Sequence, residues 1–149
     1  MHARDVKRGL LWHGILIILL GLLIGALVPV LVNPKMGVAA HVGGVMSGLF
    51  LLLVGLIWEE IRLPPRAERL TFWLFLYASY AGWLAQFLAA LFGTNWATPI
   101  AGAGYRGTDW QEYLVYAIAV TFSAAIAIAC GFALWGLRKE ALKAVATQK

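Results

Sequence analysis

Four long apolar stretches, separated by shorter polar segments, set the pattern of this chain. They cover residues 10–32, 41–60, 68–92 and 111–138. Each is long enough to cross about 30 Å of hydrocarbon, for which a helix needs about 17–25 residues. A bilayer offers no partners to backbone N–H and C=O groups, so a spanning segment satisfies them internally as a helix. The pattern therefore predicts an all-α fold, an integral membrane four-helix bundle forming a single transmembrane domain over residues 1–149.

Composition supports the membrane assignment, because 62% of the 149 residues are hydrophobic and only 13% are charged. One soluble core of this size cannot hide that much apolar surface. Ten of the twelve Lys and Arg residues lie near the chain ends or in the segment 59–69, and only Lys35 and Arg106 lie in the other two connections. The positive-inside rule then predicts cytoplasmic termini and a multi-pass protein of the cell inner membrane. The net charge of +5 therefore requires no nucleic-acid partner.

His41 stands at the start of the second apolar stretch. On a helix turning about 100° per residue, Gly44 and Gly48 fall on the same side as His41. Histidine is a common iron ligand, and glycines beside it leave room for a flat ligand. The alternative is that the glycines permit close helix packing and that His41 is solvated near the membrane surface. Gly21 and Gly25 form a second face of small residues, which favours close contact within or between protomers.

Polar groups in the third and fourth stretches gather on stripes. The stripe in the third stretch contains Ser79, Trp83, Gln86 and Ala90. The stripe in the fourth contains Glu112, Tyr116, Ala119 and Ser123. Polar groups are costly in hydrocarbon, so both stripes are expected to face the protein interior. With His41, they converge on the half of the membrane away from the chain termini.

The longest connection, residues 93–110, is rich in glycine and aromatic residues. Long connections are commonly functional, so this one is a candidate lid over a pocket in that half of the membrane. Arg106 can neutralise a carboxylate there. The alternative is that its tryptophans and Tyr105 form an aromatic belt at the membrane surface.

Four segments resemble hydroxylaminobenzene mutases: His13–Leu16, His41–Phe50, Gly55–Trp58 and Gly104–Glu112. The likeness runs over about residues 10–138. Those membrane enzymes convert hydroxylaminobenzene to 2-aminophenol. The first two segments are also similar, more distantly, to styrene oxide isomerase, a haem b membrane trimer that rearranges epoxides to aldehydes. The resemblance implies an isomerase with a small aromatic hydroxylamine substrate, haem b, and assembly as a homotrimer.

The resemblance also implies a haem site, because a histidine at the position of His41 binds the iron in styrene oxide isomerase. Gly44 and Gly48 are then expected beside the macrocycle, and Arg106 beside a propionate. Ferric iron acts as a Lewis acid, which would weaken the N–O bond of the substrate. At Ser47 the sequence departs from styrene oxide isomerase, which has asparagine there.

Further residues are candidates for the chemistry that follows N–O cleavage. An amide or carboxylate can orient the N–H group or move the ring proton, and the candidates are Gln86, Asn95, Asp109 and Glu112. An aromatic face can stabilise the developing cation, and the candidates are Trp83 and Tyr116. A tyrosine faces the substrate in styrene oxide isomerase, and the candidates are Tyr77, Tyr80 and Tyr105. Because an isomerisation balances internally, no nicotinamide or flavin is expected.

Other functions remain as alternatives. An epoxide isomerase would fit the same residues with a different substrate. A bis-histidine electron carrier needs two axial ligands at one depth, whereas His13 and His41 lie toward opposite ends of their helices. A small multidrug exporter is disfavoured, because such pumps carry an acidic residue in the first helix and residues 10–32 contain none. A purely structural membrane protein leaves the convergent polar stripes unexplained.

Overall fold

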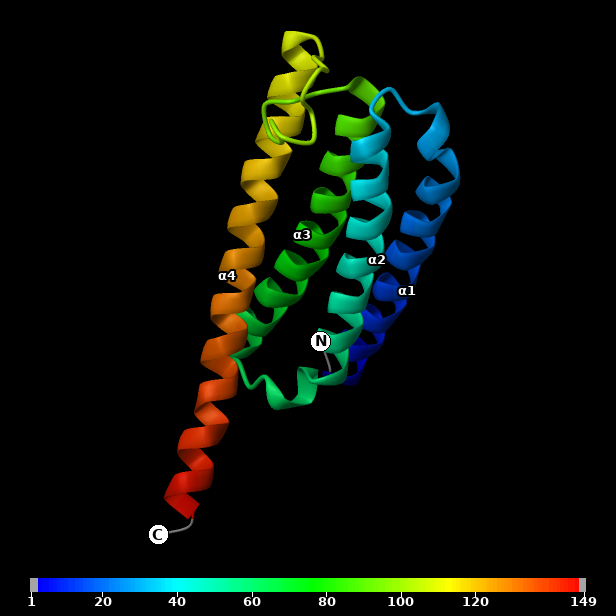
Figure 1. The fold of residues 1–149 in the computed structure, drawn as a ribbon. Coiled ribbons are helices and arrows are strands. Elements are labelled where there is room, and N and C mark those ends of the chain that lie inside the picture. The colour runs from blue at the N-terminus through cyan, green and yellow to red at the C-terminus, as the bar shows by residue number, and fades with distance from the viewer. Residues whose placement is uncertain (1–2, 148–149) are drawn as a thin grey trace.

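The computed structural model describes residues 3–147, with side chains described for residues 4–138. Within that range it contains four long helices and no strand (Figure 1). The helices are α1 Ala3–Leu27, α2 Pro34–Leu56, α3 Pro65–Phe92 and α4 Asp109–Thr147. All four are long and apolar enough to cross a membrane. The predicted all-α, four-helix membrane fold is confirmed.

The start of α2 differs from the prediction in a way that matters for the site. The helix begins at Pro34, seven residues before His41. Proline suits the first helical turn, where a missing N–H costs nothing. The Asn33 side chain caps this end by accepting a hydrogen bond from the Met36 amide at 3.2 Å. His41 therefore lies about two turns inside the helix, not at its mouth.

The other helices also depart from the predicted bounds. α1 begins at Ala3 instead of residue 10, and it ends at Leu27, where Pro29 lies in a short 3-10 turn, Val28–Val30. α3 begins three residues before the predicted position, α4 begins two residues before it, and α4 continues well past residue 138. The second helix ends at Leu56 and is followed by a 3-10 turn, Trp58–Glu60. Apolar stretches mark the part suited to lipid, and a helix can extend beyond that part.

Glycines bring α1 and α2 into backbone contact. A Cβ atom at Gly44 would lie 2.7 Å from the Cα atom of Gly21, and one at Gly14 would lie 2.9 Å from the carbonyl oxygen of Gly48. Each of these Cβ atoms would lie closer to the facing helix than van der Waals contact allows, so only glycine permits this helix separation. The close-packing alternative for the glycine faces is therefore the one found within a single chain.

The third helix lies between α2 and α4 (Figure 1). It packs against both of them and touches α1, whereas no Cα atom of α2 lies within 8 Å of one in α4 among the described residues. The α3–α4 loop, residues 93–108, lies at the end of the bundle opposite to the start of α1 (Figure 1). Gly93 ends α3 with a positive φ of 69°, a conformation that favours glycine. Residues of α2, α3 and α4 line two pockets along this side of α3, and we call the space that they form the cleft.

Candidate functional site

His41 is held against α1 by its ring. Its Nδ1 atom lies 2.9 Å from the carbonyl oxygen of Gly21, and a Cβ atom at Gly25 would lie 2.7 Å from the same nitrogen. A carbonyl oxygen can only accept, so Nδ1 carries the proton and donates it to Gly21. The half-buried ring therefore keeps the lone pair of Nε2 for another partner. Histidines that bind metals commonly have this arrangement.

The open glycine surface expected beside His41 is absent. Gly44 lies against Gly21 and the indole of Trp83, and Gly48 lies against Gly14 and Ile18. Both glycines are buried. Within one chain α1 therefore covers the surface on which a flat ligand was expected to lie, and the place of Gly44 and Gly48 beside a macrocycle stays a prediction without support from this packing.

Two neighbouring cavities lie in the cleft between α2, α3 and α4. The central cavity has a volume of about 340 Å³ and is lined by Met46, Ser47, Phe50, Ala78, Ser79, Gly82, Gln86, Phe122, Ile126 and Cys130. The loop cavity, of about 370 Å³, is lined by Met36, Ala39, Ala85, Gln86, Ala89, Ala97, Thr98, Ala101, Val115, Ala119, Phe122 and Ser123. Such volumes are in the range of small-molecule sites.

Gln86 and Phe122 line both cavities, so they mark the junction of the cleft. The Gln86 carboxamide lies over Gly43, where an added Cβ atom would be 2.8 Å from Nε2. The absence of a side chain at Gly43 thus makes room for the carboxamide. Among the predicted catalytic residues, Gln86 has the best position to meet a ligand in the cleft.

The polar stripe predicted on α3 does face the protein interior. Ser79 and Ala90 are buried, and Trp83 and Gln86 are partly buried. Trp83 stacks on Phe87 with ring centroids 5.9 Å apart and packs against Gly44, so it lies between helices and lines neither cavity. Its Nε1 atom and the Ser79 Oγ atom are buried without a hydrogen-bond partner among the described residues.

Tyr80 is turned away from the cleft toward α1. Its hydroxyl lies 2.8 Å from Nδ1 of His13, and the two rings meet edge to face. This pair joins α1 and α3 by a hydrogen bond inside the bundle. The predicted substrate contact of Tyr80 therefore has no support from its position in one chain. Tyr77 likewise bonds to Thr121 on the surface, at 2.7 Å.

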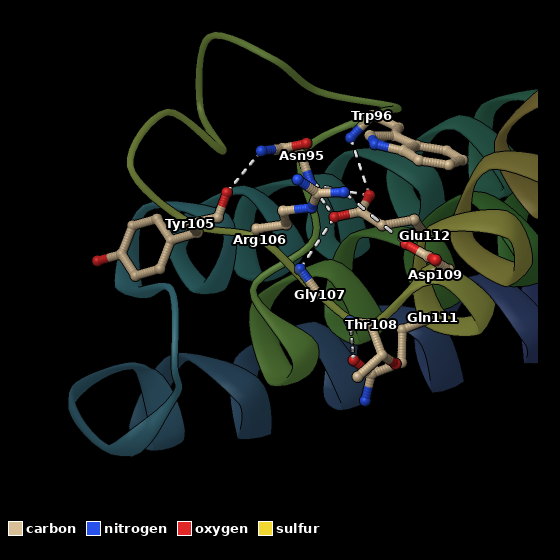
Figure 2. A network of polar contacts seen from close by, with 9 residues as sticks. All are labelled: Asn95, Trp96, Tyr105, Arg106, Gly107, Thr108, Asp109, Gln111 and Glu112. Atoms are coloured by element: carbon tan, nitrogen blue, oxygen red, sulfur yellow. Dashed lines mark hydrogen bonds and ion pairs between the residues drawn. The ribbon is translucent and has the colours of Figure 1, made fainter.

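The carboxylate of Glu112 organises the α3–α4 loop (Figure 2). Glu112 is only 1% exposed, and its oxygens accept hydrogen bonds from the amides of Asn95 at 3.1 Å, Trp96 at 3.0 Å and Gly107 at 3.0 Å. The side chain of Asn95 donates to the carbonyl oxygen of Tyr105. Loop groups thus occupy the polar atoms of Glu112 and Asn95, which points to a role in holding the loop.

Several other predicted site residues lie on the surface. Arg106 and Asp109 are 73% and 77% exposed and face each other at 3.8 Å. Tyr116 is 49% exposed on α4 and lines neither cavity. The Tyr105 ring points away from the Glu112 carboxylate (Figure 2). Of the fourth-helix stripe, only Ala119 and Ser123 reach the cleft.

Sequence reasoning missed the wall of the cleft that α4 supplies. Phe122, Ile126 and Cys130 recur at a spacing of four residues and line the central cavity. They carry no signal that separates them from lipid-facing residues, because an apolar side chain suits both environments in a membrane helix. Met46 and Phe50 on α2 were missed for the same reason.

A family model described as styrene oxide isomerase matches residues 6–138. The chain belongs to the styrene oxide isomerase family. Hydroxylaminobenzene mutase HabB of Ectopseudomonas oleovorans is 42% identical to this family member over 134 residues, which are 89% of this chain and 82% of HabB. Hydroxylaminobenzene mutase HabA of the same organism is 45% identical over 103 residues, or 68% and 76% of the two chains.

No solved structure matches this family member at a significant level. The resemblance to both the mutases and the isomerase is confirmed, and with it the assignment to the isomerases. Its four helices suit a multi-pass membrane protein. The cleft and His41 are the features of the chain that could bind a small ligand or an iron.

Proposed function

We propose that the protein is a membrane isomerase that rearranges hydroxylaminobenzene to 2-aminophenol. The reaction balances within one molecule. The N–O bond and the ortho C–H bond break, and an ortho C–O bond and a second N–H bond form. The observation that carries the proposal is the 42% identity to a hydroxylaminobenzene mutase across 89% of this chain. An epoxide substrate is the alternative suggested by the family description.

His41 is the residue that would hold a haem iron. Its Nδ1–H group is engaged by the Gly21 carbonyl oxygen, which fixes the ring and leaves Nε2 as the ligand atom. No group of three or more His, Cys, Asp and Glu side chains that could hold a metal occurs in the described part of the chain. A single axial histidine is sufficient for haem. When bound, ferric haem supplies a Lewis acid for the hydroxylamine oxygen.

The chain itself offers binding and orientation in the cleft. The Gln86 carboxamide can both donate and accept, so it can orient the N–H and O–H groups of the substrate. The Phe122 ring beside it offers a face to a cationic aromatic intermediate. The mostly apolar lining keeps water scarce, which protects such an intermediate from hydrolysis.

The arrangement around α2 supports a homo-oligomer, with the number three taken from the resemblance. His41 faces α1, whereas the cleft-lining residues of α2 lie about 120–180° around the same helix. One chain therefore keeps its own His41 and its own cleft on opposite sides of α2. A neighbouring copy can bring a second cleft to the His41 side. Residence in the cell inner membrane is also part of this proposal.

The test uses detergent-purified protein with substitutions at His41 and His13, which are both hydrogen-bonded. The wild-type protein is expected to show a Soret band and to convert hydroxylaminobenzene without nicotinamide or flavin. His41→Ala is expected to lose both, because the axial ligand positions the iron and tunes it. His13→Ala is the matched control, since His13 is also part-buried and hydrogen-bonded, and it is expected to keep most of its haem.

The role of haem and the mutase reaction can be refuted independently of each other. A His41→Ala protein with the wild-type Soret band and normal turnover would demote His41 to a packing residue. Turnover by a wild-type protein without haem would remove the iron and leave the mutase reaction. No turnover of any aryl hydroxylamine by haem-loaded protein would remove the reaction itself.

A further inference from the structure

Ser79 is a buried polar group that the proposed reaction does not use. It lines the central cavity from α3, is 4% exposed, and its Oγ atom has no hydrogen-bond partner among the described residues. Three hydroxyls of α3 and α4 differ in this respect, because Thr71, Thr121 and Ser123 each donate to a carbonyl oxygen of their own helix. Unsatisfied buried hydroxyls are uncommon because they are costly. The unsatisfied hydroxyl of Ser79 therefore points to a hydrogen bond with a group of a bound ligand.

The spacing between Ser79 and Gln86 defines the length of that ligand. The two residues are seven positions apart on α3, so they lie on nearly the same side of the helix and about 10 Å apart along its axis. Both line the central cavity, and Phe50 and Phe122 contribute aromatic walls from α2 and α4. An apolar cavity of about 150 Å³ already accepts benzene. The volume of about 340 Å³ found here leaves room for a substituted ring.

We infer that Ser79 is a specificity-determining residue that contacts the para position of an aryl hydroxylamine. This inference rests on the proposed function. The ring lies in the central cavity, the hydroxylamino group points toward Gln86, and the para substituent points toward Ser79. A hydroxyl donor at that end selects substituents with an uncharged hydrogen-bond acceptor, such as acetyl or nitro. A para carboxylate is disfavoured, because no cationic side chain lines the central cavity within the described residues.

Ser79 takes no part in the catalytic step. Ser79 touches the end of the substrate that does not react, so its removal changes the choice among substrates and not the chemistry at nitrogen. A purely structural serine would change folding or activity with every substrate alike. The ratio of two substrates that differ only at the para position distinguishes these roles.

The first test compares kcat/KM for 4-acetyl- and 4-isopropyl-phenylhydroxylamine. Within one protein the ratio contains the electronic effect of the acetyl group, and that effect cancels when wild type and variant are compared. Ser79→Ala is expected to lower the ratio about tenfold, the effect of one hydrogen bond. Thr71→Val is the control, since Thr71 is a buried hydroxyl of the same helix, bonds to the Ala67 carbonyl oxygen and lines neither cavity. Its ratio is expected to match the wild type.

The second test needs no turnover and uses Cys130, the single cysteine of the chain, which lines the same cavity. 4-Acetylaniline is expected to slow maleimide labelling of Cys130 in the wild-type protein. Ser79→Ala is expected to raise the concentration for half-protection about tenfold, whereas Thr71→Val leaves it unchanged. This measurement follows binding in the cavity alone.

The outcomes separate the inference from the function. If the wild-type protein turns over both substrates and Ser79→Ala changes neither the ratio nor the protection, the inference is overturned and the isomerase stands. If no aryl hydroxylamine reacts but protection depends on Ser79, the binding site is supported and the proposed reaction falls. If 4-isopropylaniline and alkyl chains protect Cys130 as well as 4-acetylaniline does, the cavity is a lipid-filled gap and the inference is overturned.

Discussion

Alanine at two adjacent glycines of α2 should have opposite consequences. At Gly43 the nearest atoms to a new Cβ all belong to the side chain of Gln86: Oε1 is the closest, and Nε2 follows at 2.8 Å. At Gly44 the nearest atom is the Cα of Gly21, at 2.7 Å, and Cδ1 of Trp83 follows at 2.9 Å. A flexible carboxamide can rotate away from the added methyl group. The backbone of α1 cannot.

The magnitudes follow from these contacts. Ordinary contacts of a Cβ atom begin at 3.4 Å, so Gly44→Ala forces α1 and α2 apart by about 0.7 Å. Overpacking of this kind costs about 1–3 kcal/mol in the free energy of unfolding. Both substitutions gain the same helix propensity, about 1 kcal/mol, so the difference between the variants reports the contacts alone. For Gly43→Ala we expect stability no lower than wild type, with kcat/KM about tenfold lower because the displaced Gln86 loses one substrate hydrogen bond.

The assay combines denaturant unfolding in detergent with turnover of hydroxylaminobenzene, and it adds Gln86→Ala and the Gly43→Ala, Gln86→Ala double variant. If Gly43→Ala acts only by moving Gln86, the double variant has the activity of Gln86→Ala. Full activity of Gln86→Ala would refute the role of the carboxamide, and full activity of Gly43→Ala alone would refute its displacement by the added methyl group. Independent, additive losses would refute the contact as its cause.

Three further predictions follow from other contacts. Glu112→Gln replaces an acceptor oxygen with a donor and should lower the free energy of opening of the α3–α4 loop by about 1–3 kcal/mol. Faster hydrogen exchange of the loop amides would show this, and an unchanged exchange rate would mean that the carboxylate does not hold the loop. Tyr80→Phe removes the hydrogen bond to His13 and should lower the free energy of unfolding by about 1 kcal/mol, and an unchanged value would deny that bond. Cysteines placed at Lys35 or Arg106 should react in intact cells with an impermeant thiol reagent added outside, and reaction only from the cytoplasm would invert the topology.

The sequence was sufficient for the fold because hydrophobic length alone selects spanning helices. Boundaries were harder, since Pro34 resembles a loop residue in isolation and becomes a helix start only when Asn33 caps the turn. The inward position of Gln86 was predictable from the cost of an amide in hydrocarbon. The loop-holding role of Glu112 was not predictable, because its partners are backbone amides, which every sequence contains.

Pairing between helices was also beyond the sequence. A glycine stripe is equally consistent with a planar ligand and with another helix, and only the contact of Gly44 with Gly21 decides between them. The α4 wall of the cleft could not be found, because Phe122 and a lipid-facing phenylalanine look alike along the chain. The cleft therefore depends on which helices lie apart from one another, and no local sequence pattern encodes that property.

The gap between α2 and α4 has a kinetic consequence. In a membrane-spanning bundle, any part of such a gap that a neighbouring copy leaves uncovered is filled by acyl chains, so a ligand that enters there is drawn from the lipid phase. Its effective concentration is then a mole fraction in the bilayer, set by partitioning. Adding inert phospholipid at a constant total amount of substrate would dilute that fraction and slow turnover. An apparent KM expressed per volume of water would rise with the amount of lipid in the assay, although the protein itself had not changed.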